Sequence, residues 1–428
     1  MYTKDIVRDI FNYSLESVLP KNFISRSCNI KDDVLYFENE AYDLSGYKNI
    51  YIFGSGKAAY SMAKEMEKIL GHKIYKGLVV APYNNEELQS IKVAIASHPI
   101  PTQKSIDSAK ALLEMMQECD EDDLYIYLLS GGSSALIEIP IRPITLEELQ
   151  QTTTLMLSHN LEIHEINAVR KHLSQIKGGL LASSCKARGV VLVISDIIDN
   201  ELDAIGSAPL YADKSSFSDV KNILDAKDLY RRMPNSVQEV IQKGLKGDIN
   251  ESPFEPLARV THQIIASNAH AMETARLYAI RLGLSVKVIK EPMEGEVTEM
   301  AKKILELIDS CDEQCILLGG ECTVALAGDG KGGRNQHLAL LMLEKICSKN
   351  LDITFLSAAT DGIDGNSDAA GAVVNLKSCQ KAKELGIDIQ KYIKSFDSYN
   401  FFKQTNELVM TGPSGTNVID IAIIIKGT

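Results

Sequence analysis

Residues 49–59 read NIYIFGSGKAA, an apolar run that ends in a glycine-rich turn with a lysine and leads into a helical pattern reaching about Leu70. The same order recurs at residues 124–135, LYIYLLSGGSSA. Apolar runs without polar alternation are typical of strands covered on both faces, as in parallel sheets with helices on each side. These two stretches predict an α/β fold.

Similar strand-like runs occur along the whole chain. They are 49–53, 77–81, 93–97, 124–129, 190–195, 260–266, 285–289, 315–318, 353–358 and 418–425. In open α/β sheets, ligands bind beyond the carboxyl ends of the strands. We therefore expect the catalytic and binding residues in the loops that follow these runs.

A chain of 428 residues exceeds what one core usually supports, which favours two domains. The best linker candidate is residues 246–257, KGDINESPFEPL, because it combines glycine, serine and two prolines. We therefore expect an N-terminal domain over residues 1–245 and a C-terminal domain over 258–428.

The composition limits the partners. The chain has 45 lysine and arginine residues and 57 aspartate and glutamate residues, a net charge of −12, which argues against nucleic-acid binding but not against a small anionic ligand. No stretch approaches the ~20 apolar residues of a membrane span, and the N-terminus lacks a signal-peptide core. We expect a cytoplasmic protein, no membrane partner, and reduced thiols for its eight cysteines.

Two loops are candidate anion sites. Gly54, Ser55, Gly56 and Lys57 form the first, which matches neither the Walker A loop nor G-x-G-x-x-G. The alternative is a tight turn with a solvated lysine. The second loop holds Ser130, Gly131, Gly132, Ser133 and Ser134, and its alternative is a plain polar turn. Ser133 lacks the G-x-S-x-G pattern of a serine hydrolase.

Two further segments of the N-terminal half carry charged candidates. A helix is predicted over 165–181, and five polar residues lie off its apolar stripe: Asn167, Arg170, Lys171, Ser174 and Lys177. A solvated basic face is the simpler interpretation. Asp196 ends an apolar strand, where a carboxylate suits metal binding or base catalysis; the alternative is a helix cap or turn.

In the C-terminal half, Arg334 follows a glycine-rich loop and opens a helical stretch. The helix dipole disfavours a cation there, so we expect a bound anion beside it rather than a flexible surface loop. Asp361 lies in a loop, 360–371, that fails the calcium-loop spacing but could hold a divalent ion together with phosphate and water. Residues 411–417 read as a turn. Together these loops supply the cations, backbone donors, metal ligand and base of phosphoryl transfer.

The chain resembles the glycerate 2-kinases whose C-terminal half is called the multi-organism fragment with rich leucine, some members of which were labelled hydroxypyruvate reductases. The matching segments run in the family's order over nearly the whole chain. They are GSGKAA (54–59), SHPIP (97–101), LLSGGSSAL (128–136), INAVRKHLSQIKGG (166–179), ISD (194–196), GGECTV (319–324), GKGGRNQ (330–336), TDGIDGNSDAAGA (360–372) and TGPSGTNV (411–418).

The resemblance implies ATP- and Mg²⁺-dependent phosphorylation of the 2-hydroxyl of D-glycerate. It also implies a large doubly wound, Rossmann-like domain with a mostly parallel sheet, and a smaller α/β domain facing it across a cleft. Lys57 and Arg334 correspond to the family's functional lysine and arginine. Asp196 is our candidate to orient or deprotonate the hydroxyl, and both Asp196 and Asp361 are candidate metal ligands. The remaining expected substrate or nucleotide contacts are Gly54, Ser55, Gly56, Ser130, Gly131, Gly132, Ser133, Ser134, Asn167, Arg170, Lys171, Glu321, Thr323, Asn335, Gly412, Gly415, Thr416 and Asn417.

One departure from the family pattern concerns residues 207–210. The family reads close to S-G-P-T, whereas this chain has Ser207-Ala208-Pro209-Leu210, and Ala208 takes a positive φ less readily than glycine. Three alternatives stay open: an NAD(P)H-dependent hydroxypyruvate reductase, a kinase of a related 2-hydroxy acid, and a silent sugar-acid-binding protein. The sequence leaves open whether the protein is a monomer or a homodimer.

Overall fold

The computed structural model describes residues 3–37, 40–324 and 329–427. The chain divides into two compact units. We call Ile24–Ile265 the parallel unit, and Met1–Phe23 together with Ala266–Thr428 the mixed unit.

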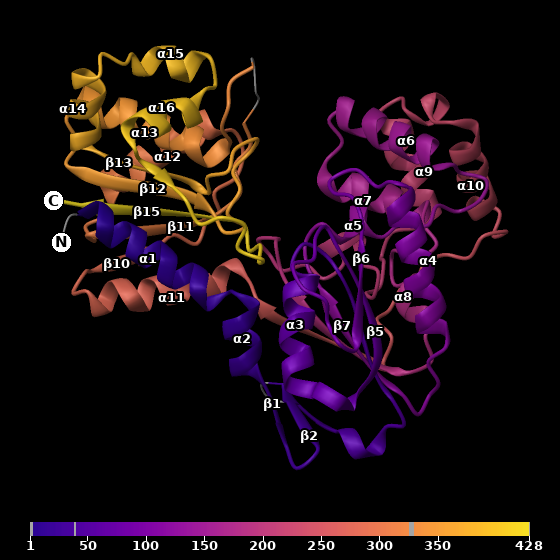
Figure 1. Ribbon diagram of the computed structural model, residues 1–428. Coiled ribbons are helices and arrows are strands. Elements are labelled where there is room, and N and C mark those ends of the chain that lie inside the picture. The colour runs from indigo at the N-terminus through magenta and orange to yellow at the C-terminus, as the bar shows by residue number, and fades with distance from the viewer. Residues whose placement is uncertain (1–2, 38–39, 325–328, 428) are drawn as a thin grey trace. The chain divides into compact units, whose positions relative to one another are not determined.

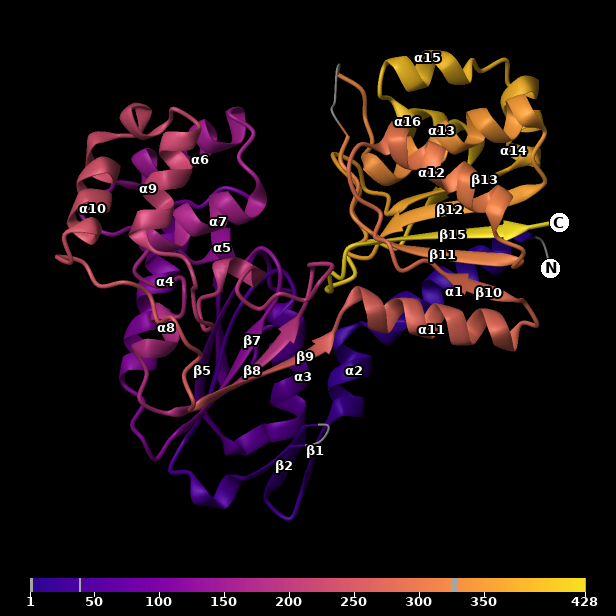
Figure 2. The same cartoon turned by 180° about the vertical axis from the view of Figure 1, so that it is seen from behind.

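The parallel unit is built on a six-stranded sheet in the order β6-β5-β4-β7-β8-β9. Its strands are β4 (Ile50–Ser55), β5 (Ile74–Ala81), β6 (Ile91–Ile95), β7 (Leu124–Leu129), β8 (Arg188–Ile194) and β9 (Val260–Ala266). The pairs β4–β5, β5–β6, β4–β7 and β7–β8 are parallel. Helices α3 (Ala59–Leu70) and α4 (Gln103–Gln117) cover opposite faces of the sheet (Figures 1 and 2), which confirms the doubly wound prediction.

Two smaller parts complete this unit. A three-stranded antiparallel sheet comprises β1 (Cys28–Lys31), β2 (Val34–Phe37) and β3 (Glu40–Asp43). A helical layer with its own apolar core contains α6 (Leu146–Ser158), α7 (Ile163–His172), α9 (Phe217–Ala226) and α10 (Asn235–Leu245). The short helices α5 (Ser133–Leu136) and α8 (Leu180–Ser183) follow strand or loop segments.

The mixed unit holds a second six-stranded sheet, in the order β10-β11-β15-β12-β13-β14. Its strands are β10 (Val286–Val288), β11 (Cys315–Gly320), β12 (Ile353–Ala359), β13 (Gly371–Asn375), β14 (Leu408–Val409) and β15 (Asp420–Lys426). Its helices are α1 (Thr3–Ser17), α11 (Asn268–Arg281), α12 (Val297–Ser310), α13 (Arg334–Lys349), α14 (Leu376–Glu384), α15 (Ile389–Lys394) and α16 (Ser398–Thr405). Helix α2 (Pro20–Ser27) spans the boundary between the units.

Strand direction in this second sheet departs from the prediction. Only β10–β11 is parallel, whereas β15 runs antiparallel to both β11 and β12. Helices α1 and α11 cover one face of the sheet and α12 and α13 the other (Figure 1). An apolar run indicates that a strand is buried on both faces of its sheet, but it does not indicate the direction of the strand. This mostly antiparallel sheet is covered by helices on both faces, so its strands have the same apolar pattern as parallel ones.

The unit boundary also differs from the expected one. Glu251 accepts a hydrogen bond from the backbone N–H of Phe217, and the carbonyl of Pro253 accepts one from Asp213. The segment 246–257 is therefore fastened within the parallel unit, and the boundary falls after Ile265. Helix α1 packs against α11, β12 and β15, which places the N-terminal residues in the mixed unit.

The cysteines depart in part from the expectation of reduced thiols. Cys347 of α13 and Cys379 of α14 form a disulfide, and the other six are free. Among the helices that the structure describes, none combines the length and apolar character needed to cross a bilayer.

Candidate active site

The turn after β4 and the loop after β7 are interlocked. The backbone N–H of Lys57 donates to the carbonyl of Gly131 at 2.9 Å, and that of Ala58 donates to Ser130 Oγ at 3.0 Å. Gly56 has a φ of +134°, and a Cβ there would lie 2.1 Å from Ser130 Oγ. Glycine is required at position 56 because the two loops touch there.

Three side chains from separate segments surround the glycine pair of the second loop. A Cβ on Gly131 would lie 1.7 Å from Asp196 Oδ2. A Cβ on Gly132 would lie 2.8 Å from His98 Cδ2 and 3.2 Å from Lys57 Cγ. The structure therefore brings Lys57, Asp196 and His98 together at the carboxyl ends of β4, β7 and β8, where ligands of such sheets bind.

The electrostatics of this cluster suit a proton acceptor. Burial raises the pKa of Asp196 to about 6, and the charge of Lys57 opposes that rise. A carboxylate with such a pKa is more basic than an ordinary aspartate and is still ionised near neutral pH. The cluster thus combines a carboxylate of raised pKa with a cation.

Several predicted hydroxyl ligands are instead part of the loop's own structure. Ser55 Oγ lies 2.7 Å from Tyr127 Oη and 2.5 Å from Ser133 Oγ, and all three residues are fully buried. The hydroxyl of Ser130, also buried, accepts the Ala58 hydrogen bond described above. Ser134, the remaining serine of this loop, lines a cavity.

That cavity has a volume of about 490 Å³ and lies within the parallel unit. Its titratable lining groups are His98, Glu138 and Arg170. The remaining lining residues are Pro99, Ile100, Pro101, Ser134, Ala135, Leu149, Gln150, Thr153, Thr154 and Leu157. A cavity of this size with few polar groups is typical of a small-molecule site.

The interpretation of residues 167–171 as a solvated basic face is wrong. Asn167 and Lys171 are buried. Asn167 Oδ1 accepts a hydrogen bond from Ser207 at 3.2 Å, and Lys171 Nζ lies 3.3 Å from Asp213 Oδ1. Of the three predicted contacts on α7, only Arg170 lines the 490 Å³ cavity.

A second cluster lies in the mixed unit, around the first residue of α13. Arg334 donates from Nε and Nη2 to the two carboxylate oxygens of Asp420, at 2.6 and 3.0 Å. Its Nη1 lies 2.7 Å from Glu321. The anions expected beside this cation are thus carboxylates of the chain itself.

The N-terminal donors of α13 are also satisfied internally. Asp364 is buried and accepts the backbone N–H groups of Asn335 and Gln336, at 3.1 and 2.8 Å. Burial raises the pKa of Asp364 to about 6, although these hydrogen bonds lower it. Asn335 accepts a hydrogen bond from Ser357 at 2.6 Å, so its amide oxygen supports the fold.

The loops carrying Asp361 and residues 411–417 pack on each other. Asp361 Oδ1 accepts the backbone N–H of Ile363 at 3.0 Å, its carbonyl accepts that of Ser414 at 3.1 Å, and a Cβ on Gly362 would lie 1.9 Å from the carbonyl oxygen of Gly412. Thr416 is buried, and its hydroxyl has no hydrogen-bond partner among the described residues. Gly415 and Asn417 are partly exposed and Thr323 is exposed. Gly328, which begins the glycine-rich loop before Arg334, lies outside the described residues.

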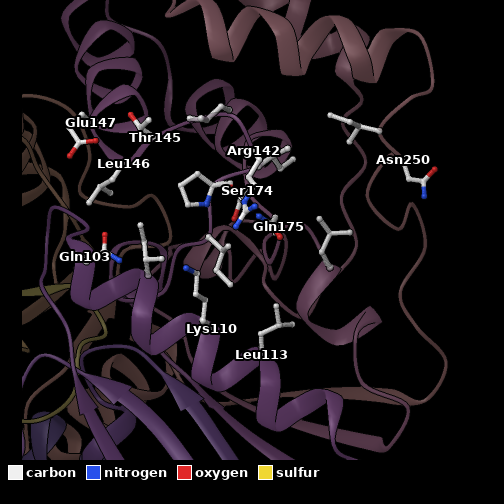
Figure 3. A pocket seen from close by; sticks show the side chains of 17 residues that line it. Gln103, Lys110, Leu113, Arg142, Thr145, Leu146, Glu147, Ser174, Gln175 and Asn250 are labelled. Atoms are coloured by element: carbon white, nitrogen blue, oxygen red, sulfur yellow. Dashed lines mark hydrogen bonds between the residues drawn. The ribbon is translucent and has the colours of Figure 1, made fainter.

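Another cavity, of about 940 Å³, lies in the parallel unit between α4 and the segments around residues 139–147 and 174–175 (Figure 3). Gln103, Lys110 and Leu113 of α4 line it, as do Arg142 and Ser174. None of the predicted site residues lines this cavity.

The candidate carboxylates for a metal ion lie in separate loops of the chain. Among described side chains, no group of three His, Cys, Asp or Glu residues could hold a metal ion. Mg²⁺ in nucleotide sites is held by one or two carboxylates together with phosphates and water. Asp196, beside Lys57, and the partly exposed Asp361 each offer one carboxylate of that kind.

Sequence reasoning missed four residues of these clusters and of the 490 Å³ cavity: His98, Glu138, Asp364 and Asp420. His98 lies within the matched SHPIP segment, which was a usable signal. Asp420 opens an apolar strand and has no local pattern that predicts a partner 86 residues away.

Comparison with known proteins places these features in a family. Residues 6–242 match a domain of unknown function designated DUF4147, and residues 314–420 match the MOFRL family. The glycerate 2-kinase of Pyrococcus horikoshii is 37% identical over 435 residues, which cover 99% of this chain and 98% of that protein. The D-glycerate 2-kinase of Thermotoga maritima is 34% identical over 388 residues, which cover 87% of this chain and 90% of that one. A crystal structure of a glycerate kinase from Thermotoga maritima superposes with a TM-score of 0.85, at 32% identity and 99% coverage of both chains.

Proposed function

The chain belongs to the glycerate 2-kinase family, and on that premise we propose that it transfers the γ-phosphoryl group of ATP to the 2-hydroxyl of D-glycerate, giving 2-phosphoglycerate and ADP. The single observation that carries the proposal is the placement of Lys57 and Asp196 around Gly131 and Gly132, at the carboxyl ends of adjacent parallel strands.

In this proposal Asp196 accepts the proton of the 2-hydroxyl while its oxygen attacks the γ-phosphorus. Its raised pKa supports that role, because a more basic carboxylate takes a hydroxyl proton more readily. Lys57 stabilises the negative charge on the transferring phosphoryl group, which is the main task of a protein in this chemistry.

Arg170 and Ser134 bind the substrate carboxylate. Both line the 490 Å³ cavity beside the Gly131–Gly132 loop. A guanidinium suits a carboxylate because it can donate two parallel hydrogen bonds.

Arg334 acts on the phosphates. Asp420 accepts hydrogen bonds from Nε and Nη2 of Arg334 and so fixes the guanidinium. When phosphate binds, Nη1 of Arg334 leaves the exposed Glu321 and donates to a phosphate oxygen. Asp361 or Asp196 would hold Mg²⁺ together with phosphate oxygens, and the bound ion would neutralise phosphate charge.

An assay of ADP release from ATP with D-glycerate tests the function. We expect turnover that requires Mg²⁺ and is lost in Asp196→Asn, with binding of D-glycerate retained. Oxidation of NADH by hydroxypyruvate without ADP release from D-glycerate would overturn the proposal in favour of a reductase. Binding of D-glycerate without turnover in the wild-type protein would indicate a silent binding protein.

A further inference from the structure

A buried charged cluster adjoins the 490 Å³ cavity, to whose lining Glu138 belongs. Glu138 and Lys177 form an ion pair in which the side chains are 4% and 1% exposed. Glu138 Oε1 also accepts hydrogen bonds from Ser174 Oγ at 2.6 Å and from the backbone N–H of Ile139 at 3.0 Å. Lys177 Nζ additionally donates to the carbonyl of Ile137 at 3.2 Å. Both partners are thus held by several contacts.

Arg170 stands beside this pair without joining it. Arg170 is partly buried and lines the cavity. Among the described residues, its guanidinium has no hydrogen-bond partner and no ion-pair partner within 4.0 Å, although its backbone carbonyl accepts the N–H of Leu173. Burial lowers the pKa of Arg170, and the negative charge of Glu138 opposes that effect. Partial burial of a guanidinium without hydrogen-bond partners costs free energy, and a bound anion that accepts its hydrogen bonds offsets that cost.

The charges of the cluster explain why Glu138 does not engage the guanidinium N–H groups of Arg170. One carboxylate and two cations leave a net charge of +1, and the unpaired cation is the one that faces the cavity. Because Lys177 occupies Glu138 Oε2 and Ser174 occupies Oε1, the carboxylate is already satisfied. Without Lys177, the carboxylate would be buried without a cation, and Arg170 would be the nearby guanidinium able to pair with it.

We propose that Lys177 is a positioning residue that occupies Glu138 and thereby leaves Arg170 available to bind the carboxylate of D-glycerate. The inference rests on the proposed function, because it takes D-glycerate as the anion in the cavity. Lys177 touches neither substrate nor nucleotide and acts through Glu138 and Arg170.

The test distinguishes two effects of removing Lys177: the pairing of Arg170 with Glu138, and the loss of a structural ion pair. In Lys177→Met, we expect the KM for D-glycerate to rise ~10-fold or more, equivalent to about 1.4 kcal/mol, while the KM for ATP changes little. In the double variant Glu138→Gln/Lys177→Met, neither charge is present, Arg170 is released, and the KM for D-glycerate returns to within about threefold of wild type.

Lys4→Met is the matched control. It breaks another largely buried ion pair, Lys4–Glu407, in the mixed unit. We expect it to lower the thermal midpoint without raising the KM for D-glycerate. If Lys177→Met does not fold, the KM of the double variant for D-glycerate is compared with that of Arg170→Gln. A double-variant KM near the wild-type value supports the inference. A double-variant KM as high as that of Arg170→Gln overturns it.

The inference is overturned if the double variant has as high a KM as the single variant, or if Lys177→Met leaves the KM unchanged. Calorimetric titration with D-glycerate alone keeps it distinct from the proposed function. If the wild-type protein binds D-glycerate but releases no ADP, the kinase proposal fails and the Kd series of the same variants decides the role of Lys177. If the wild-type protein binds no D-glycerate, both fail.

Discussion

Gly131→Ala is the substitution that probes the Lys57–Asp196 cluster most selectively. The new Cβ would lie 1.7 Å from Asp196 Oδ2, so the carboxylate must move by about 1.5 Å to reach van der Waals contact. The backbone at residue 131 has no positive φ and accepts alanine without strain. The perturbation therefore falls on the position of the Asp196 side chain.

A displacement of about 1 Å in a catalytic group can cost ~10²-fold in rate. We expect kcat/KM for D-glycerate to fall ~10²-fold, about 2.7 kcal/mol, with the thermal midpoint within a few degrees of wild type. The assay is steady-state ADP release with D-glycerate as the varied substrate.

Gly46→Ala is the matched control, because a Cβ there meets nothing within 4 Å. It should keep wild-type kinetics. If Gly131→Ala retains kcat/KM within about threefold of wild type, the Asp196 carboxylate can move freely without loss and is not the base.

Four further outcomes are expected. Because Asp196 must be ionised to accept a proton and its pKa lies at about 6, kcat/KM should fall as pH drops below about 6; a flat profile from pH 5 to 8 would contradict this. The same raised pKa means that stability falls as the pH rises from about 4, the ordinary value of an aspartate, to about 6, and that this loss is complete above pH 6. Asp196→Asn should therefore be at least as stable as wild type at pH 8, and a clear loss of stability there would contradict the burial effect. Arg334→Lys loses the paired hydrogen bonds to Asp420, and kcat/KM should fall ~10²-fold or more, whereas a near-wild-type value would make Arg334 a structural cap. Ala208 has a φ of +53°, so Ala208→Gly should raise the free energy of unfolding in urea by about 1 kcal/mol, and an unchanged value would show that the strain is absent.

The sequence predicted well what depends on local pattern. The runs before Gly54 and Ser130 are strands of one parallel sheet, and the loops after them meet, because the carboxyl ends of parallel strands share one edge. Asp196 reaches the same loops for the same reason.

What the sequence could not supply is pairing across long separations. The antiparallel placement of β15 between β11 and β12 depends on the fold of the whole unit, and an apolar run carries no information about strand direction. Lys171 and Lys177 look like solvated cations on a helical pattern, yet Asp213 and Glu138 bury them as ion pairs 42 and 39 residues away. The helix dipole predicts a bound anion beside Arg334. The anions there are Asp420 and Glu321, and no local pattern links Arg334 to Asp420, which lies 86 residues along the chain.

The most direct test of the central claim is the identity of the product formed from ATP and D-glycerate. Phosphorus NMR of the reaction mixture distinguishes an ester at the 2-hydroxyl from one at the 3-hydroxyl. We predict 2-phosphoglycerate in the wild-type reaction and no phosphate ester in the Asp196→Asn reaction. Formation of 3-phosphoglycerate, or undiminished ester formation by Asp196→Asn, would contradict the placement of the 2-hydroxyl between Asp196 and the phosphate bound by Lys57.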